Sequence, residues 1–242
     1  MWMEQIALRL LKGKMMPLNK VTPRSNMYEF ITHTWNTAKG ACPHNCDYCY
    51  CKKWHDETHP QPKLHFDHGE LQRDLGEYHF IFVGSSCDMW AKDIPTAWIE
   101  KTLAHCNQYT NEYLFQSKNP GRFYLHVKDF PSHTTLGTTI ETNRIYPQMG
   151  NTPSPQARAD AMALLKQEGF KTMVTIEPVM DFDVKLLVEL IRLANPDWVN
   201  ISADSKGHHL PEPSKDKILD LVAELYTFTE IKQKNNLKRL MR

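Results

Sequence analysis

Short apolar runs alternate with amphipathic stretches along most of the chain. The run 79–83 is continuously apolar and ends at a Gly-Ser-Ser turn, which is typical of a strand buried on both faces. The stretch 183–194 instead places Leu187, Val188 and Ile191 on one face at helical spacing. Runs of the first kind predict six strands, at 26–36, 79–83, 112–116, 135–140, 171–176 and 198–202.

Helix signals separate these strands. Pro95 suits the first turn of a helix, Ser154 is a suitable N-cap before Pro155, and Gly169 ends the helix that follows. Strands joined through amphipathic helices predict right-handed crossovers and a parallel sheet, hence an α/β fold. Six strand–helix units are too few for a closed eight-stranded barrel. We expect helices after 95, over 119–128, between 154 and 169, over 183–194 and around 218–225, with 49–54 as a further helical start and 58–66 irregular.

Composition is that of an ordinary globular protein, with 41% hydrophobic and 24% charged residues among 242. No Gly/Ser-rich linker divides the chain, so we expect one domain over 1–242, with a core at about 26–228 and a basic tail at 229–242. The 29 basic and 28 acidic residues give a net charge of +1, which indicates no global attraction to nucleic acid or membrane. The stretch 1–11 lacks the features of a secretion signal, and we expect a cytoplasmic protein without a membrane partner.

Three of the six cysteines, Cys42, Cys46 and Cys49, fall within eight residues. Thiolates select zinc or iron–sulfur clusters, and a four-iron cluster closed by protein uses four cysteines. Three cysteines therefore leave one iron open for chemistry. A zinc site that adds Cys51 or a nearby histidine is the alternative, although structural zinc sites usually present two separated ligand pairs. Both a catalytic cluster and a non-catalytic metal-binding protein stay open at this point.

Cys42, Cys46, Tyr48 and Cys49 resemble the radical S-adenosylmethionine (radical SAM) signature, Cys-x3-Cys-x2-Cys with an aromatic residue before the last cysteine. The resemblance implies a partial (β/α)6 TIM-like barrel and a [4Fe-4S] cluster whose free iron binds S-adenosylmethionine. It further implies a reductant such as flavodoxin or ferredoxin, and cleavage to a 5′-deoxyadenosyl radical that abstracts hydrogen from a substrate. The stretch from about 35 to 228 also resembles short phage and prokaryotic radical SAM proteins of unknown function.

Ligands of parallel α/β folds bind at the carboxyl ends of the strands, where several polar residues of this chain cluster. The resemblance implies specific roles for them. The turn of Gly84, Ser85 and Ser86 would bind the methionine amino group, and Glu141 and Asn143 would bind the ribose hydroxyls. Ile176 would contact the adenine, Glu177 would lie near the substrate, and Tyr48 would lie beside the cofactor.

Cys87 lies next to that turn, where its thiol would return a hydrogen atom to a substrate radical, a role that cysteine plays in one radical SAM enzyme. The alternative is a buried cysteine that acts as a small hydrophobic residue. A nucleotide or nucleic acid is one candidate substrate. Its support is the basic tail, because phosphates attract such charges. The tail contains Lys232, Lys234, Lys238, Arg239 and Arg242.

Overall fold

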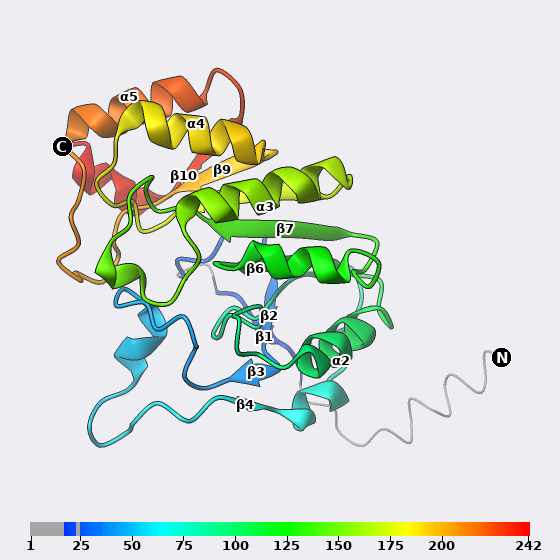
Figure 1. Ribbon diagram of the computed structural model, residues 1–242. Coiled ribbons are helices and arrows are strands. Elements are labelled where there is room, and N and C mark those ends of the chain that lie inside the picture. The colour runs from blue at the N-terminus through cyan, green and yellow to red at the C-terminus, as the bar shows by residue number, and fades with distance from the viewer. Residues whose placement is uncertain (1–16, 23–24) are drawn as a thin grey trace.

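The computed structural model describes residues 17–22 and 25–242 (Figure 1). The stretch 1–11, in which we predict no secretion signal, lies outside the described residues. An eight-stranded sheet runs through the molecule in the order β1-β2-β5-β6-β7-β8-β9-β10. Its strands are β1 (Asn19–Lys20), β2 (His33–Trp35), β5 (Phe80–Val83), β6 (Glu112–Ser117), β7 (Thr134–Thr139), β8 (Lys171–Ile176), β9 (Trp198–Ile201) and β10 (Glu230–Gln233).

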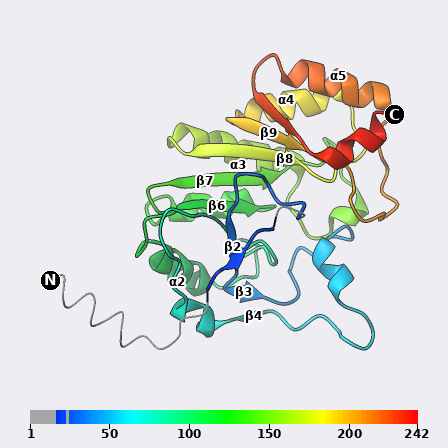
Figure 2. The same ribbon diagram turned by 180° about the vertical axis from the view of Figure 1, so that it is seen from behind.

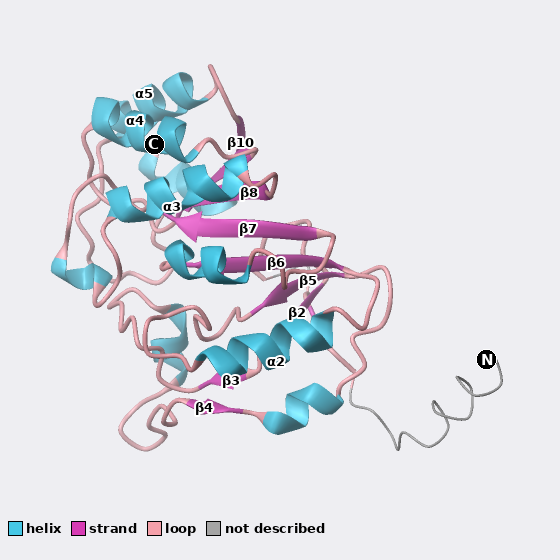
Figure 3. Ribbon diagram, turned by 45° about the vertical axis from the view of Figure 1, so that its right-hand side comes forward, coloured by secondary structure: helices cyan, strands magenta, loops and turns pink. Residues whose placement is uncertain are grey.

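All neighbouring strands from β2 to β10 pair in parallel, and only β1 is antiparallel, at the edge beside β2. Helices connect the parallel strands and cover one face of the sheet, as Figure 3 shows. The prediction of an α/β fold with parallel strands is therefore confirmed. The longer helices are α2 (Thr96–Cys106), α3 (Pro155–Gln167), α4 (Val184–Ala194) and α5 (Lys215–Leu225), and the 3-10 helices are η1 (Tyr50–Trp54), η2 (His68–Gln72), η3 (Pro120–His126), η4 (Pro147–Met149) and η5 (Asn235–Leu240).

Alternate residues of each strand face opposite sides of the sheet. In β8, Val174 and Ile176 are fully buried in the main core, which the helices complete. Met173 instead belongs to a second apolar cluster on the other face, and Thr175 on that same face lines a cavity. The face opposite the helices is called the inner face below. It is apolar near the amino ends of the strands and polar near their carboxyl ends.

The segment before β2 covers the apolar part of the inner face. Tyr28, Phe30 and Ile31 pack there against Leu114 and Trp198 of the sheet. The prediction of a strand over 26–36 is thus wrong for its first part, since only His33–Trp35 pairs with a neighbour. An apolar and aromatic run satisfies the strand pattern, but here these side chains fill the inner face. Figure 2 views the molecule from the side opposite to Figure 1 and shows this segment in blue, crossing over the strands.

The basic tail contributes structure that the sequence pattern did not reveal. Its strand β10 pairs in parallel with β9 through four residue pairs, and η5 follows. A small antiparallel pair, β3 (Ala38–Lys39) with β4 (His65–Phe66), flanks the cysteine-containing stretch. The sheet has β1 and β10 as its two ends, so within the described residues it is an open sheet. None of the helices in the described part of the chain is long and apolar enough to cross a membrane.

Candidate active site

A cavity of about 600 Å³ opens at the carboxyl ends of the parallel strands. One wall is the stretch 41–54, called the cysteine loop below, which runs from just after β3 into η1. The opposite wall consists of residues at the ends of β5, β6, β7, β8, β9 and β10. The lining includes nine of the predicted site residues, namely Cys42, Cys46, Tyr48, Cys49, Gly84, Ser85, Ser86, Cys87 and Glu177.

The turn at η4 holds the cysteine loop in place through hydrogen bonds to its backbone and to one of its thiols. Asp47 donates its backbone N–H to the carbonyl of Gln148 at 2.9 Å, and the Cys46 thiol donates to the carbonyl of Met149 at 3.3 Å. Gly150 makes this approach possible, because its φ is +64° and a Cβ there would lie 2.1 Å from the carbonyl oxygen of His44. No residue with a side chain fits this position without moving one of the two loops.

The signature thiols differ in their environments. The neighbouring Cys87 thiol lowers the pKa of Cys42 to about 7, and the neighbouring Cys51 thiol lowers the pKa of Cys49 to about 6. Burial raises the pKa of Cys46 to about 11. All six cysteines are free thiols, which excludes a disulfide between any two of them in this structure. The lowered pKa values of Cys42 and Cys49 increase their thiolate fraction, and the thiolate is the form that binds metals.

A buried Asp–His pair holds the cysteine loop against the strand ends. His44, between the first two signature cysteines, is only 3% exposed, and its Nε2 lies 2.9 Å from Oδ2 of Asp88. The same carboxylate oxygen accepts from the Ser117 hydroxyl at 2.9 Å and from the backbone N–H of Lys118 at 2.8 Å. Burial opposes both charges, but their interaction raises the pKa of His44 and lowers that of Asp88. One carboxylate thus connects three loops that line the cavity.

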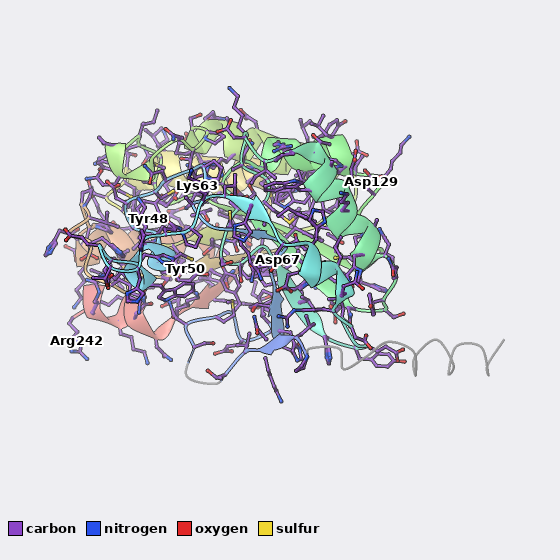
Figure 4. All side chains as sticks on the ribbon, turned by 90° about the horizontal axis from the view of Figure 1, so that it is seen from below. Tyr48, Tyr50, Lys63, Asp67, Asp129 and Arg242 are labelled. Carbon is purple, nitrogen blue, oxygen red and sulfur yellow. The ribbon has the colours of Figure 1, made fainter. Side chains whose placement is uncertain are left out.

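The predicted Gly-Ser-Ser turn faces the cysteine loop directly. The Tyr50 hydroxyl donates to the carbonyl of Ser85 at 2.5 Å, and the Cys51 thiol donates to the carbonyl of Ser86 at 3.3 Å. On its other side the turn is fixed by Asn36, whose Oδ1 accepts from the backbone N–H of Ser86 at 2.9 Å. The structure therefore brings the signature cysteines and the predicted methionine-binding turn to one cavity. Figure 4 labels Tyr48 and Tyr50, two residues of the cysteine loop that line it.

Glu141 lies directly behind the cavity wall. It is fully buried, and its carboxylate pairs with the equally buried Arg158 at 2.7 Å. The Tyr48 hydroxyl and the Lys118 ammonium both donate to its other oxygen. Burial favours the neutral acid, but Arg158 and Lys118 lower the pKa of Glu141 to about 2. Glu141 therefore reaches the cavity only through Tyr48 and Lys118, which both line it.

Sequence reasoning missed Lys118 and Arg158 as parts of the site. Lys118 follows β6 at its carboxyl end, and its ammonium lies 5.0 Å from the centre of the Tyr48 ring. Its position after an apolar strand was a signal that the sequence did carry. Arg158 belongs to α3, where nothing in the sequence distinguishes it from a solvated helix residue.

Besides Glu141, two further predicted residues do not line the cavity. Asn143 accepts from the backbone N–H of Asp183 at 2.8 Å, just before α4 begins. Ile176 is fully buried in the core on the helix side of the sheet. Neither residue lines the cavity, because Asn143 lies beyond the strand end and Ile176 points away from the inner face.

The far end of the cavity is polar and rests on the apolar cluster of the inner face. Both carboxylate oxygens of Glu177 accept from the Lys234 ammonium, at 2.8 and 3.0 Å. The same ammonium lies 4.5 Å from the centre of the Tyr28 ring, and the Tyr28 hydroxyl donates to Gln116 at 2.8 Å. Lys234 thus lines the cavity from the position just after β10, the strand that the sequence pattern did not reveal.

The donor set fits an iron–sulfur cluster. Cys42, Cys46 and Cys49 come from one loop and line one cavity. Within residues 17–22 and 25–242, no three His, Cys, Asp or Glu side chains converge on a single ion position. A four-iron cluster requires no such convergence, because each cysteine binds a different iron.

No family model and no curated protein matches the sequence. Solved structures do match. Spore photoproduct lyase complexed with dinucleoside spore photoproduct superimposes with a TM-score of 0.67 at 12% identity, over 92% of this chain and 81% of that one. A mutant of that lyase with bound AdoMet and dinucleoside spore photoproduct superimposes with a TM-score of 0.57 at 14% identity, over 87% of this chain and 66% of that one.

The fold is similar to that of radical SAM enzymes. A further match supports this: the crystal structure of Streptococcus suis SuiB superimposes with a TM-score of 0.55 at 9% identity. The alignment covers 96% of this chain, which spans about half of SuiB, 53%. At such low identities these likenesses concern the fold, and the chemistry has to be argued from the residues of this chain.

Proposed function

We propose that this protein is a radical SAM enzyme. One observation carries the proposal: the three signature cysteines and the Gly84–Ser86 turn line a single cavity at the carboxyl ends of a sheet with a radical SAM-like fold. When bound, a [4Fe-4S] cluster and S-adenosylmethionine supply reductive cleavage to methionine and a 5′-deoxyadenosyl radical that abstracts hydrogen. Cys42, Cys46 and Cys49 hold the cluster.

The residues around the cysteine loop orient S-adenosylmethionine in this proposal. Backbone carbonyls of the Gly84–Ser86 turn accept from its ammonium, and Lys118, the cavity lysine beside the signature cysteines, pairs with its carboxylate. Glu141 accepts from both Lys118 and Tyr48 and so holds their side chains in position for this contact. Ribose contacts of Glu141 and Asn143, and an adenine contact of Ile176, stay predictions.

The substrate end of the cavity lies at Glu177 and Lys234. We place a nucleotide-containing substrate there, supported by the polar lining and by the dinucleoside spore photoproduct with which the similar lyase is complexed. Cys87 is 1% exposed and lines the cavity, and its thiol lowers the pKa of Cys42. In the proposal its thiol returns a hydrogen atom to the substrate radical, and the thiyl radical left on Cys87 is restored to the thiol by one electron from the reductant and one proton from solvent. Replacing Cys87 with alanine tests this role: unchanged product and turnover would exclude it.

Anaerobic reconstitution with iron and sulfide tests the enzyme class. We expect visible sulfur-to-iron charge-transfer absorption and, after reduction by dithionite or flavodoxin, 5′-deoxyadenosine from S-adenosylmethionine. Cys42→Ala abolishes both signals, whereas Cys106→Ala, at a core cysteine of α2, keeps both. A protein that binds zinc without visible absorption, or a cluster that yields no 5′-deoxyadenosine, would instead establish a non-catalytic metal-binding protein.

A further inference from the structure

Two aromatic side chains lie exposed at the mouth of the cavity. Trp54 is 62% and Tyr50 40% exposed, and both residues line the cavity. Their ring centres are 5.2 Å apart with the ring planes nearly perpendicular, at 81°. Both belong to η1, which directly continues the cysteine loop. Exposed aromatic pairs of this kind offer a flat apolar face to a planar group that enters the cavity.

Lysines surround this aromatic pair. Lys52 and Lys206 line the cavity, and Lys53 precedes Trp54 and donates to the carbonyl of Lys206. Lys52 has one distant carboxylate partner, Asp47 at 3.9 Å, which is itself 66% exposed. Lys53 and Lys206 have no carboxylate within 4.0 Å in the part of the chain that the structure describes. Their charges are therefore available to an anionic ligand.

The acidic residues that line the cavity bind partners other than the lysine side chains beside the aromatic pair. Asp88 accepts from His44, Glu177 pairs with Lys234, and Asp204 accepts from His208 at 2.7 Å. The rim of the cavity is consequently basic and aromatic, while the acidic groups are bonded within the protein.

The basic tail is not the source of this surface. Lys232 lies 4.8 Å from the centre of the Trp198 ring on the inner face, and Lys234 is bonded to Glu177. Arg239 pairs with Glu212. These three tail residues are thus engaged in contacts within the protein, whereas Lys53 and Lys206, beside the aromatic pair, have no carboxylate partner among the described residues.

We propose that the mouth of the cavity binds single-stranded nucleic acid, with one base stacked on the Trp54 ring, against which the Tyr50 ring packs edge to face, and the flanking phosphates on Lys53 and Lys206. A stacking platform within a basic rim is the arrangement by which proteins hold unpaired strands. A duplex does not fit it, because its base faces are covered by neighbouring bases. The next base along the strand then lies over the cavity, where the proposed function places the group that reacts. In this respect the inference rests on the proposed function.

The experiment measures binding of fluorescein-labelled single strands of about 12 nucleotides by anisotropy, because site sizes of this kind are about 4–16 nucleotides. Separate oligo-dT and oligo-U arms distinguish DNA from RNA, and a duplex of equal length is the competitor. Trp54→Ala weakens binding about tenfold or more, whereas Trp54→Phe retains most of it. Tyr78→Ala, at an 86% exposed tyrosine outside the cavity lining, is the matched control and leaves affinity unchanged.

The lysines are tested through salt dependence. The double variant Lys53→Gln with Lys206→Gln lowers the slope of log affinity against log salt by about 1 to 1.5, because each single-strand phosphate contact contributes about 0.7. Circular dichroism confirms that each variant is folded.

Several results would overturn the proposal. Equal affinity of wild type and Trp54→Ala for the single strands would remove the stacking role, and tighter binding of the duplex would remove the preference for unpaired bases. An equal loss of S-adenosylmethionine binding in Trp54→Ala would assign the aromatic pair to the cofactor site. Slower reduction by flavodoxin without any loss of oligonucleotide binding would assign it to a reductant. Failure of the proposed function is seen separately, as strand binding without 5′-deoxyadenosine.

Discussion

Replacing Glu141 with glutamine removes one charge from a fully buried ion pair. Glu141 and Arg158 both have 0% exposed side chains, and the substitution keeps the shape of the residue. The guanidinium of Arg158 then lies buried opposite a neutral amide, while Lys118 and Tyr48 lose a charged acceptor. We expect a folded protein of clearly lower stability, because an uncompensated charge inside a protein is costly.

Two estimates of the magnitude agree. Breaking a buried pair by removing one partner costs about 3–5 kcal/mol. Independently, lowering the pKa of Glu141 from 4.5 to about 2 corresponds to about 3 kcal/mol of stability in the ionised form. We therefore expect Glu141→Gln to reduce the free energy of unfolding by about 3 kcal/mol near neutral pH.

Urea unfolding of the metal-free, reduced protein, followed by circular dichroism, measures this loss. Glu189→Gln, at an exposed acid of α4, is the matched control and changes stability by less than about 0.5 kcal/mol. Adding Arg158→Met to Glu141→Gln removes the unpaired charge as well. The double variant is therefore less destabilised than the sum of the two single changes by more than about 1 kcal/mol.

The effect depends on pH with a definite sign. Because the folded-state pKa of Glu141 lies below its unfolded value, its stabilisation is fully present above pH 4.5 and disappears as the pH falls toward 2. The difference in stability between wild type and Glu141→Gln shrinks over this interval. A variant within about 0.5 kcal/mol of wild type at neutral pH, or a difference that does not change between pH 4.5 and 2, would refute the reasoning.

Two further predictions concern the supports of the cysteine loop. Asp88→Asn weakens the link between His44 and the strand ends, so reconstituted protein loses iron to a chelator about tenfold faster, and an unchanged rate would contradict the anchoring role. Gly150→Ala meets the carbonyl of His44 and lowers both thermal stability and iron content. Gly169→Ala, which also has positive φ but nothing within 4 Å of its Cβ, costs only about 1 kcal/mol, and equal losses in the two variants would contradict the close-approach argument.

Most of the strands and the grouping of the three signature cysteines were predictable because their signals are local. Apolar runs such as 79–83 satisfy the strand pattern within themselves, and the spacing of the three signature cysteines places three thiols on one loop whatever surrounds it. The same local logic failed for 26–36, whose aromatic residues cover the inner face, and for β10, whose sequence Glu-Ile-Lys-Gln has Ile231 as its one apolar residue and so resembles an exposed tail.

By itself the sequence determined that three thiols share one loop and that the fold is a parallel α/β fold, since both follow from residues close together in the chain. Only the tertiary structure decided which charges meet. Glu141 contacts Arg158, Tyr48 and Lys118 from separate elements, and this pairing excludes its carboxylate from the cavity that the strand-end position had suggested. The same holds for Trp54, whose exposure beside free lysines arises from the way the cysteine loop lies across the sheet. Side chains distant in sequence become neighbours only when the sheet brings the strand ends to one edge. A local sequence pattern contains no information about such contacts.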